Sequence, residues 1–202
     1  MRPTKSSGRL GRPRSFDIDR ALDRALQVFW RKGYEGTSLA DLTKAVGVNR
    51  PSLYAAFGDK EALFRKAFER YLNGPAAYTR EALKEPTARA VIARLFRGAA
   101  DLNTAPRNPG GCLTVQGALA CGAAGDSIRQ ELAAYRAAGE AALRRRFERA
   151  KSEGDLPATV NPADLARYVA TIVYGMAVQA AGGASRDKLQ HVIEMALQSL
   201  PL

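Results

Sequence analysis

Apolar side chains recur at intervals of three and four residues along most of this 202-residue chain. The spacing is clearest in residues 88–99, 128–147 and 189–200, where it places the apolar residues on one face of a helix. No run of alternating apolar and polar residues bounded by turn signals indicates a strand. We therefore expect an all-α fold of about nine or ten helices.

Clusters of glycine and proline divide this helical pattern into a small N-terminal module and a larger C-terminal part. The first cluster, Asn73-Gly74-Pro75, sets the boundary between them. We expect a basic arm over residues 1–14, a three-helix module over residues 15–72 and a helical bundle over residues 73–202. Further breaks are expected inside the bundle, at residues 106–111, 154–162 and 182–183.

The chain is strongly basic, with 31 Lys and Arg against 20 Asp and Glu and a formal net charge of +11. Such an excess favours a polyanionic partner, either nucleic acid or an anionic membrane surface. A charge run is often only a solvated tail, but here the run adjoins a module with features of a nucleic-acid binder. The excess is sharpest in the first 16 residues, which have no acidic residue and carry Arg2, Lys5, Arg9, Arg12 and Arg14.

No segment predicts export or membrane insertion. The N-terminus lacks the apolar stretch of a secretory signal. Residues 165–184 are the most apolar stretch of membrane-spanning length, but they include Arg167 and Gln179 and many small residues, which indicates a buried helix. We expect no membrane partner, a cytoplasmic location, and two reduced cysteines rather than a disulfide.

The sequence shows no set of residues typical of an enzyme or of a metal site. It has no nucleophile–base pair, no phosphate-binding glycine loop and no cluster of carboxylates. His191 is the only histidine, and no cysteine lies near it in the sequence, which argues against zinc. We therefore expect no catalytic residue, no metal and no cofactor.

The N-terminal module begins with an amphipathic helix that ends at Gly33, a residue suited to the backbone of a helix C-cap. Three short helices are predicted between Gly33 and Tyr71. Thr37 or Ser38 can cap the first of these, and Asp41 lies three residues beyond Ser38, as in a capping box. The amphipathic helix is expected to present one apolar face, formed by Ile18, Leu22, Ala25 and Phe29.

The second short helix is predicted over residues 50–57. A tight turn at Gly47-Val48 precedes it, and Asn49 is a suitable N-cap. Leu53 and Phe57 are four residues apart and are expected to face the core. This pattern of helix, glycine turn and short helix is typical of a helix-turn-helix.

The outward residues of this short helix suit the recognition of DNA. A short helix with small and polar residues near its N-terminus can enter the major groove. Arg50 can donate to a guanine edge or a phosphate, while Ser52 and Tyr54 can donate to phosphate oxygens. Pro51 fits the first turn, and Lys60 in the next helix can reach the same DNA backbone. The alternative is a helical hairpin whose polar residues are only solvated.

Residues 15–72 resemble the DNA-binding domain of the TetR family of transcriptional regulators. The matching stretches are ALQVFWRKGYEGT, residues 25–37, and VGVNRPSLYAAFGDKEALF, residues 46–64. The resemblance covers every motif in the module. This sequence has Pro51 where the family often has glycine, and Ala55-Ala56 where an aromatic residue and a histidine are common.

The resemblance implies specific roles within the module. Residues 39–58 would be the helix-turn-helix, with residues 50–57 as the recognition helix. Tyr54 and Lys60 would contact phosphates, and so would Thr37.

The basic arm offers a second mode of contact. Gly11-Arg12-Pro13-Arg14 is a flat cationic element of the kind that inserts into a narrow A·T-rich minor groove. Arg12 and Arg14 are therefore candidate minor-groove contacts. A solvated tail is the alternative.

The family resemblance implies that the C-terminal part pairs two subunits through its last two helices and holds an effector pocket. We expect a homodimer, because two helix-turn-helix units are needed to read an operator with two half-sites. The alternative is that the apolar stripes of these helices serve the subunit's own core. The small residues that would permit close helix approach are Ala166, Ala170, Ala177 and Ala181.

An effector pocket would need polar and aromatic lining residues. The sequence does not identify the ligand. The candidates for the lining are Gln116, Tyr135, Tyr168, Tyr174, Met176 and Gln179.

Cys112 follows Gly110-Gly111 and opens an apolar segment, GGCLTVQGALAC, that we expect to form one helix. The positive end of its dipole would then favour the thiolate of Cys112. Cys121 would lie about 13.5 Å along this helix and on its opposite side, too far for a disulfide. The element resembles TetR-type regulators that sense electrophiles or oxidants through the first thiol. A free cysteine is otherwise often a small buried hydrophobe.

These observations predict a DNA-binding transcriptional regulator. We expect a repressor that a small-molecule effector, or modification of the thiol, releases from its double-stranded operator. The alternatives are a helix-turn-helix activator and a passive architectural DNA-binding protein without an effector.

Overall fold

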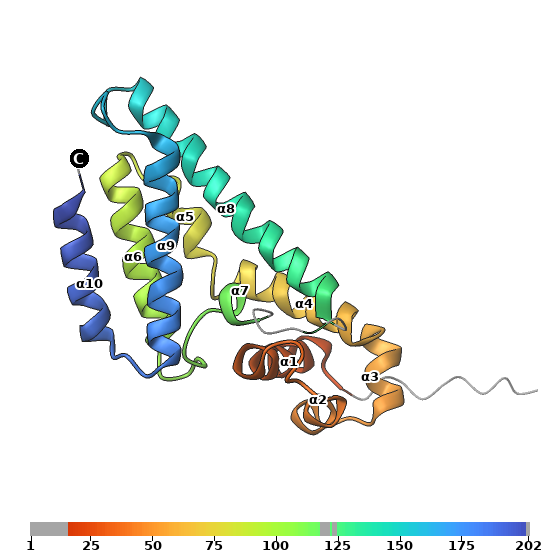
Figure 1. Ribbon diagram of the computed structural model, residues 1–202. Coiled ribbons are helices and arrows are strands. Elements are labelled where there is room, and N and C mark those ends of the chain that lie inside the picture. Colours follow the sequence, from red (N-terminus) through yellow and green to blue (C-terminus); the bar gives the residue numbers. More distant parts are fainter. Residues whose placement is uncertain (1–15, 118–121, 123–124, 201–202) are drawn as a thin grey trace, which may run out of the picture.

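The computed structural model describes residues 16–117, 122 and 125–200 (Figure 1). Over these residues the chain forms ten α-helices and no strand, which confirms the predicted all-helical class. The basic arm with Arg12 and Arg14, and also Cys121, lie outside the described residues. The helices are α1 Ile18–Lys32, α2 Leu39–Val46, α3 Arg50–Phe57, α4 Lys60–Asn73, α5 Tyr78–Ala82, α6 Ala88–Thr104, α7 Leu113–Gln116, α8 Asp126–Ser152, α9 Pro162–Ala181 and α10 Arg186–Ser199.

Helices α1 to α4 gather at one end of the molecule (Figure 1). The carboxylate of Asp17 caps α1 by accepting from the backbone of Asp19 and Arg20, and α1 ends at Gly33 with a φ of 71°. Of the four apolar residues predicted to line the inner face of α1, Ala25 and Phe29 are buried and Leu22 is half-buried, but Ile18 is 38% exposed. That part of the prediction is wrong because Ile18 is the first residue of the helix and lies at the edge of the module.

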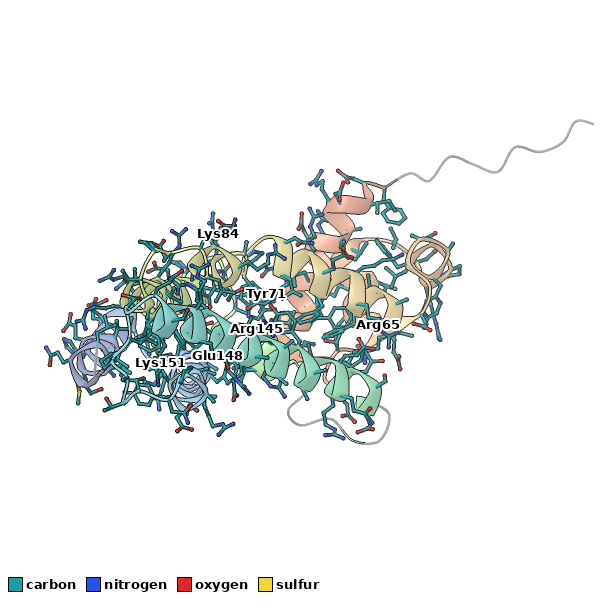
Figure 2. The ribbon with its side chains drawn as sticks, turned by 90° about the horizontal axis from the view of Figure 1, so that it is seen from above. Arg65, Tyr71, Lys84, Arg145, Glu148 and Lys151 are labelled. Atoms are coloured by element: carbon teal, nitrogen blue, oxygen red, sulfur yellow. The ribbon has the colours of Figure 1, made fainter. Side chains whose placement is uncertain are left out.

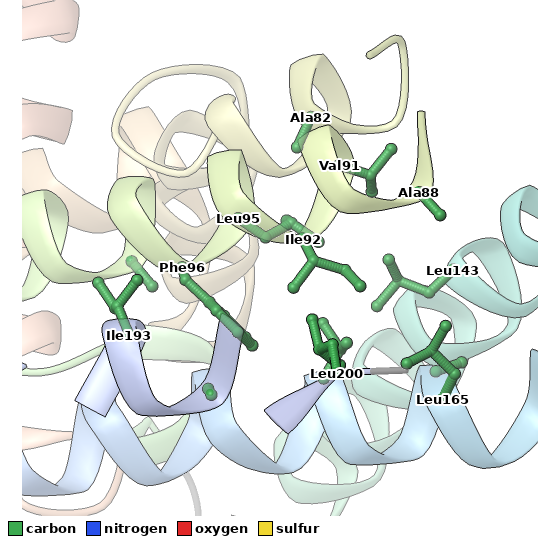
Figure 3. Close-up of a cluster of buried hydrophobic side chains, with 14 of the residues drawn as sticks. Ala82, Ala88, Val91, Ile92, Leu95, Phe96, Leu143, Leu165, Ile193 and Leu200 are labelled. Carbon is green, nitrogen blue, oxygen red and sulfur yellow. The ribbon is translucent and has the colours of Figure 1, made fainter. Parts of the chain in front are cut away.

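Helices α6, α8, α9 and α10 form the bundle at the other end (Figure 1). Helix α9 contacts both α6 and α8, and α10 packs on α6. Figure 3 shows the apolar core that these contacts bury. Its members come from all four helices and include Ile92, Phe96, Leu143, Leu165 and Ile193. Helix α9 thus buries one face in the bundle and exposes the other, so the prediction of a buried helix holds for one face only. No helix in the described part of the chain is long and apolar enough to cross a membrane.

A second apolar core fills the N-terminal module and extends beyond it. Trp30, Phe64 and Tyr71 are fully buried there. Leu113 of α7 and Ile128 of α8 belong to the same cluster, although they lie far along the chain. The module and the bundle therefore share side chains at their junction, so a displacement in one is felt as a packing change in the other.

The predicted helix from Cys112 to Cys121 is wrong. Helix α7 contains only Leu113–Gln116, and a bend follows at Gly117. The reason is a tertiary contact, because the carbonyl of Gly117 accepts a 2.7 Å hydrogen bond from the backbone of Tyr34. A helix of one turn has little dipole, and the predicted distance between the two cysteines loses its basis. We call residues 110–117 the cavity turn.

Candidate functional site

Helix α3 has the boundaries that its sequence predicts, and its position is fixed at both ends. The side chain of Asn49 accepts a 2.9 Å hydrogen bond from the backbone of Ser52. The helix ends at Gly58, with a φ of 84°. Leu53 and Phe57 are buried in the module. Their burial leaves the first turn of α3 facing outward.

Polar side chains gather on this outward face. Arg50 and Pro51 are exposed, and Ser52 and Tyr54 are half-buried. The guanidinium carbon of Arg50 lies 5.3 Å from the centre of the Tyr54 ring, and a guanidinium nitrogen lies 3.5 Å from the Tyr54 hydroxyl. This contact orients Arg50 along the helix, with donors available to a phosphate or to a base edge.

Lys60 begins the next helix beside this face. Its Nζ lies 4.4 Å from the centre of the Tyr34 ring, a cation–π contact. Tyr34 is itself buried against Phe64, with the two rings edge to face at 5.4 Å. The position of Lys60 thus depends on the loop that joins α1 to α2.

Thr37 does not fit its predicted phosphate contact. It is fully buried, and its hydroxyl donates a 2.6 Å hydrogen bond to the carbonyl of Gly33. The residue therefore holds the α1–α2 loop, and its side chain is not available to DNA. This is a correction to the expected set of contacts.

Helix α2 supports α3 through a well-formed N-terminus. Ser38 and Asp41 form the predicted capping box. Lys32 of α1 donates to the Asp41 carboxylate at 2.6 Å. The hydrogen bond from Lys32, together with those from Ser38, holds the pKa of Asp41 well below its usual range. The ionised carboxylate also suits the positive end of the helix dipole.

A cavity of about 280 Å³ lies in the bundle where α4 meets α5, α8 and α9. Tyr71 of α4 forms part of its wall, at the centre of the molecule (Figure 2). The remaining tyrosines of the wall are Tyr78, Tyr135 and Tyr174. Alanine, leucine and valine side chains supply most of the rest, and Arg80 adds one charged group. The cavity is thus mostly apolar with a few polar groups, as is usual for small-molecule sites.

Cys112 is the group in this wall with the most distinctive chemistry. Its sulfur lies 3.1 Å from the hydroxyl of Tyr71 and 2.9 Å from the hydroxyl of Thr114. Burial raises the pKa of Tyr71 and of Tyr78 well above the usual value, and it raises the pKa of Tyr174 to about 12. The phenols therefore stay protonated at neutral pH and can serve as hydrogen-bond donors, and Tyr71 is the one that contacts the sulfur.

Only some of the predicted lining residues reach the cavity. Cys112, Tyr135 and Tyr174 lie in its wall. Gln116 packs against Gly111 instead, within the cavity turn. The structure therefore brings the thiol and two of the predicted phenols together.

The predictions for Tyr168 and Gln179 are wrong. Tyr168 lies on the outer surface of α9, where its hydroxyl contacts that of Ser199 at 3.0 Å, and Gln179 is also exposed. Both side chains point away from the junction because α9 turns its opposite face to α6 and α8. The wall also contains Tyr71, Tyr78, Thr79 and Thr114, which were not predicted from the sequence. Tyr71 was missed because it belongs to a helix assigned to the other module.

The outer surface of α9 and α10 carries exposed apolar side chains. Three residues of the predicted small-residue stripe, Ala166, Ala170 and Ala177, are buried in the subunit's own core, whereas Ala181 is exposed. Large apolar side chains are exposed instead, which is typical of a surface that another protein covers. They are Tyr168 and Val178 on α9, and Val192 and Met195 on α10.

Comparisons with known proteins identify the family. A family model described as bacterial regulatory proteins, tetR family, matches residues 21–67, and one described as tetracyclin repressor-like, C-terminal domain, matches residues 86–196. The chain is 34% identical over 193 residues to the HTH-type transcriptional repressor ComR of Escherichia coli K12. This alignment covers 95% of the chain and 92% of ComR. It is 32% identical to the uncharacterized HTH-type transcriptional regulator YezE of Bacillus subtilis 168, with coverage of 95% and 100%.

A solved structure of another TetR family regulator is similar to this chain over most of its length. It is a cysteine-substituted form of the TetR family transcriptional regulator CifR, complexed with 26-base-pair double-strand operator DNA. The two folds superpose with a TM-score of 0.90 and 43% sequence identity, over 94% of this chain and 100% of the CifR chain. The chain belongs to the TetR family of bacterial regulatory proteins.

Proposed function

We propose that this protein is a transcriptional repressor that binds operator DNA as a homodimer and is released when the bundle cavity is filled or its thiol is modified. One observation carries the proposal: α4 begins at the DNA-facing Lys60 and reaches the cavity at Tyr71. The two candidate sites are thus joined by a single helix. The relatives are named as regulators, so we assign the protein no catalytic role and a place in the cytoplasm with the DNA.

The first turn of α3 would enter the major groove. Arg50 is the residue we assign to base recognition, because it is exposed and oriented by Tyr54. Ser52, Tyr54 and Lys60 would hold phosphates, which position the helix without reading sequence. The structure of CifR is complexed with operator DNA, which supports a DNA-binding role for this chain.

The cavity would hold a compact and largely apolar effector. Its volume of about 280 Å³ lies just below the usual range for small-molecule sites. The phenols of the wall can donate hydrogen bonds to an acceptor on such a ligand. Alternatively an electrophile can react with Cys112, forming a bond to the sulfur as the thiol proton is lost. Either event would place new atoms between α4 and the bundle.

The division of labour follows the expected domains. The arm, residues 1–14, and the module, residues 15–72, would contact DNA, and residues 73–202 would sense the effector and form the dimer. The exposed apolar side chains of α9 and α10, such as Val178 and Met195, are the surface we assign to the subunit contact. Two subunits joined there would present two α3 helices to two half-sites.

Binding-site selection from a random duplex library tests this function. The full-length protein should enrich a palindrome, and labelled copies of that duplex should bind specifically in fluorescence anisotropy. Treatment of the complex with a small thiol reagent should then release the DNA. Failure to enrich any sequence at physiological salt would overturn the assignment as a sequence-specific regulator.

A further inference from the structure

The cavity turn, residues 110–117, is at once part of the cavity wall and part of the DNA-binding module. Cys112 and Thr114 face the cavity. Leu113, between them, is fully buried in the apolar core that includes Trp30 and Tyr71. Helix α7 of this turn contacts α1 on one side and α8 and α9 on the other (Figure 1). A ligand that displaces the turn would therefore alter the packing of both the DNA-binding module and the bundle.

Two hydrogen bonds fasten the end of α1 to this turn. The indole nitrogen of Trp30 donates to the carbonyl of Gly111 at 2.8 Å, in a buried setting. The backbone of Tyr34 donates to the carbonyl of Gly117 at 2.7 Å. A side-chain carbon at Gly33 would lie 3.3 Å from the carbonyl oxygen of Gly117. The two backbones are in direct contact, so the loop cannot stay in place if the turn moves.

The loop beyond α1 leads to the DNA-binding face. The ring of Tyr34 lies under Lys60, and the hydroxyl of Thr37 ties the start of α2 back to Gly33. A shift of the loop would therefore displace a phosphate-binding lysine and the helix that supports α3. Buried donors and acceptors such as these are costly to leave unpaired, which favours concerted movement over rupture.

We infer that the cavity turn transmits the state of the cavity to the DNA-binding module through Trp30 and Tyr34, which act as positioning residues. The inference rests on the proposed function and adds a second connection to the one through α4. Filling the cavity or modifying Cys112 displaces Gly111 and Gly117, and the two hydrogen bonds carry α1 and its following loop with them. The DNA-binding faces of the dimer then leave the spacing that the operator requires.

The test uses full-length protein with Cys121→Ser, so that methyl methanethiosulfonate labels Cys112 alone. The reagent adds a methylthio group to the sulfur as a disulfide and releases methanesulfinate. DNA affinity is measured by anisotropy on a duplex from binding-site selection, before and after labelling. Trp30→Phe removes the indole donor but keeps a buried ring. Phe147→Leu is the matched control, because it replaces a buried aromatic side chain by a smaller apolar one in the bundle core, away from the turn.

Labelling should lower the affinity of the parent and of the Phe147→Leu control by about tenfold or more, a usual strength of coupling between sites. The Trp30→Phe protein should bind DNA like the parent before labelling and lose less than about threefold after it. An equal loss in Trp30→Phe would overturn the inference and leave the proposed function standing. A parent that keeps full affinity after labelling would overturn both the thiol response and the transmission.

Hydrogen exchange on the parent protein gives a second measurement that needs no variant at residue 30. The amide of Tyr34 should keep its protection when Cys112 is labelled, because its hydrogen bond to Gly117 moves with the turn and does not break. The amide of Gly58, which donates to the carbonyl of Tyr54 within α3, should keep its protection and serves as the internal control. Loss of protection at Tyr34 in a labelled protein that has lost DNA affinity would show that this hydrogen bond breaks, and it would overturn the inference.

Discussion

The hydroxyl of Tyr71 lies 3.1 Å from the sulfur of Cys112. Tyr71 belongs to the last turns of α4, whereas Cys112 precedes α7. The contact brings the helix that starts at the DNA-binding face against the most reactive side chain of the cavity wall. An atom added to the sulfur would enter the cavity beside the hydroxyls of Tyr71 and Thr114, which the sulfur already contacts.

The response to electrophiles or oxidants should therefore depend on Cys112. Cys112→Ser should keep its DNA affinity and lose the release that a mild electrophile causes in the parent, while Cys121→Ser should keep both. The two variants differ only in which thiol remains, so each is the other's control. Anisotropy before and after treatment is the measurement. If Cys112→Ser still responds fully, the thiol only packs the wall and the effector is a noncovalent ligand.

Arg50→Ala should relax the base preference of the protein at one operator position. Loss of a bidentate contact to a base costs about 1–3 kcal/mol of discrimination. Binding-site selection on the variant is the measurement. Arg145→Ala, which removes an equal charge from the exposed surface of α8 in the bundle (Figure 2), should leave preference and affinity unchanged. Unchanged preference in Arg50→Ala would remove this residue from base recognition.

Lys60→Ala should weaken binding to all DNA sequences alike. The reason is the loss of one phosphate contact, which also flattens the dependence of log affinity on log salt by about one unit. Titrations at several salt concentrations, on selected and on scrambled duplexes, measure both effects. Tyr54→Phe should weaken binding uniformly too but leave the salt slope nearly intact, because it removes a neutral donor. A sequence-dependent loss in Lys60→Ala would contradict a pure phosphate role.

Deletion of residues 1–14 should reduce affinity most for operators with A·T-rich flanks. Arg12 and Arg14 are expected to enter the narrow minor groove of such flanks, where the negative potential is enhanced. The comparison needs matched duplexes that differ only in their flanks. Equal losses on A·T-rich and G·C-rich flanks would show that the arm contributes only charge.

The protein should be a dimer in solution without DNA, and Met195→Glu should weaken that dimer. Met195 is 71% exposed on α10, close in the sequence to the exposed Val192. A carboxylate in the centre of an apolar contact must be desolvated without a partner. Light scattering at micromolar concentration measures the mass, with Ala133→Glu on the exposed side of α8 as a control. A parent that scatters as a monomer would contradict the proposed assembly.

Local signals were sufficient to predict the helix-turn-helix. Asn49 and the residues of the capping box form their capping hydrogen bonds to residues three positions away. The starts of α2 and α3 therefore follow from the sequence alone. Leu53 and Phe57 likewise follow from helical spacing. Nothing in these predictions required knowledge of what lies across the core.

The cavity depends on contacts between distant segments, and these were harder to predict. The end of α7 is set by the bond from Tyr34 to Gly117, which joins residues far apart in the sequence. The spacing of apolar residues also shows that α9 has two different faces. It does not show which of these faces packs against another helix. For this reason Tyr174 was placed correctly and Tyr168, on the same helix, was not.

Trp30 is the only tryptophan of the chain. Its indole is held between the Tyr71 ring, edge to face at 4.8 Å, and the carbonyl of Gly111. Indole emission is sensitive to hydrogen bonding and to nearby aromatic rings, so the unlabelled protein carries an optical reporter at the junction of its two parts. Compound libraries can therefore be screened by intrinsic fluorescence, without a dye and before any operator is known.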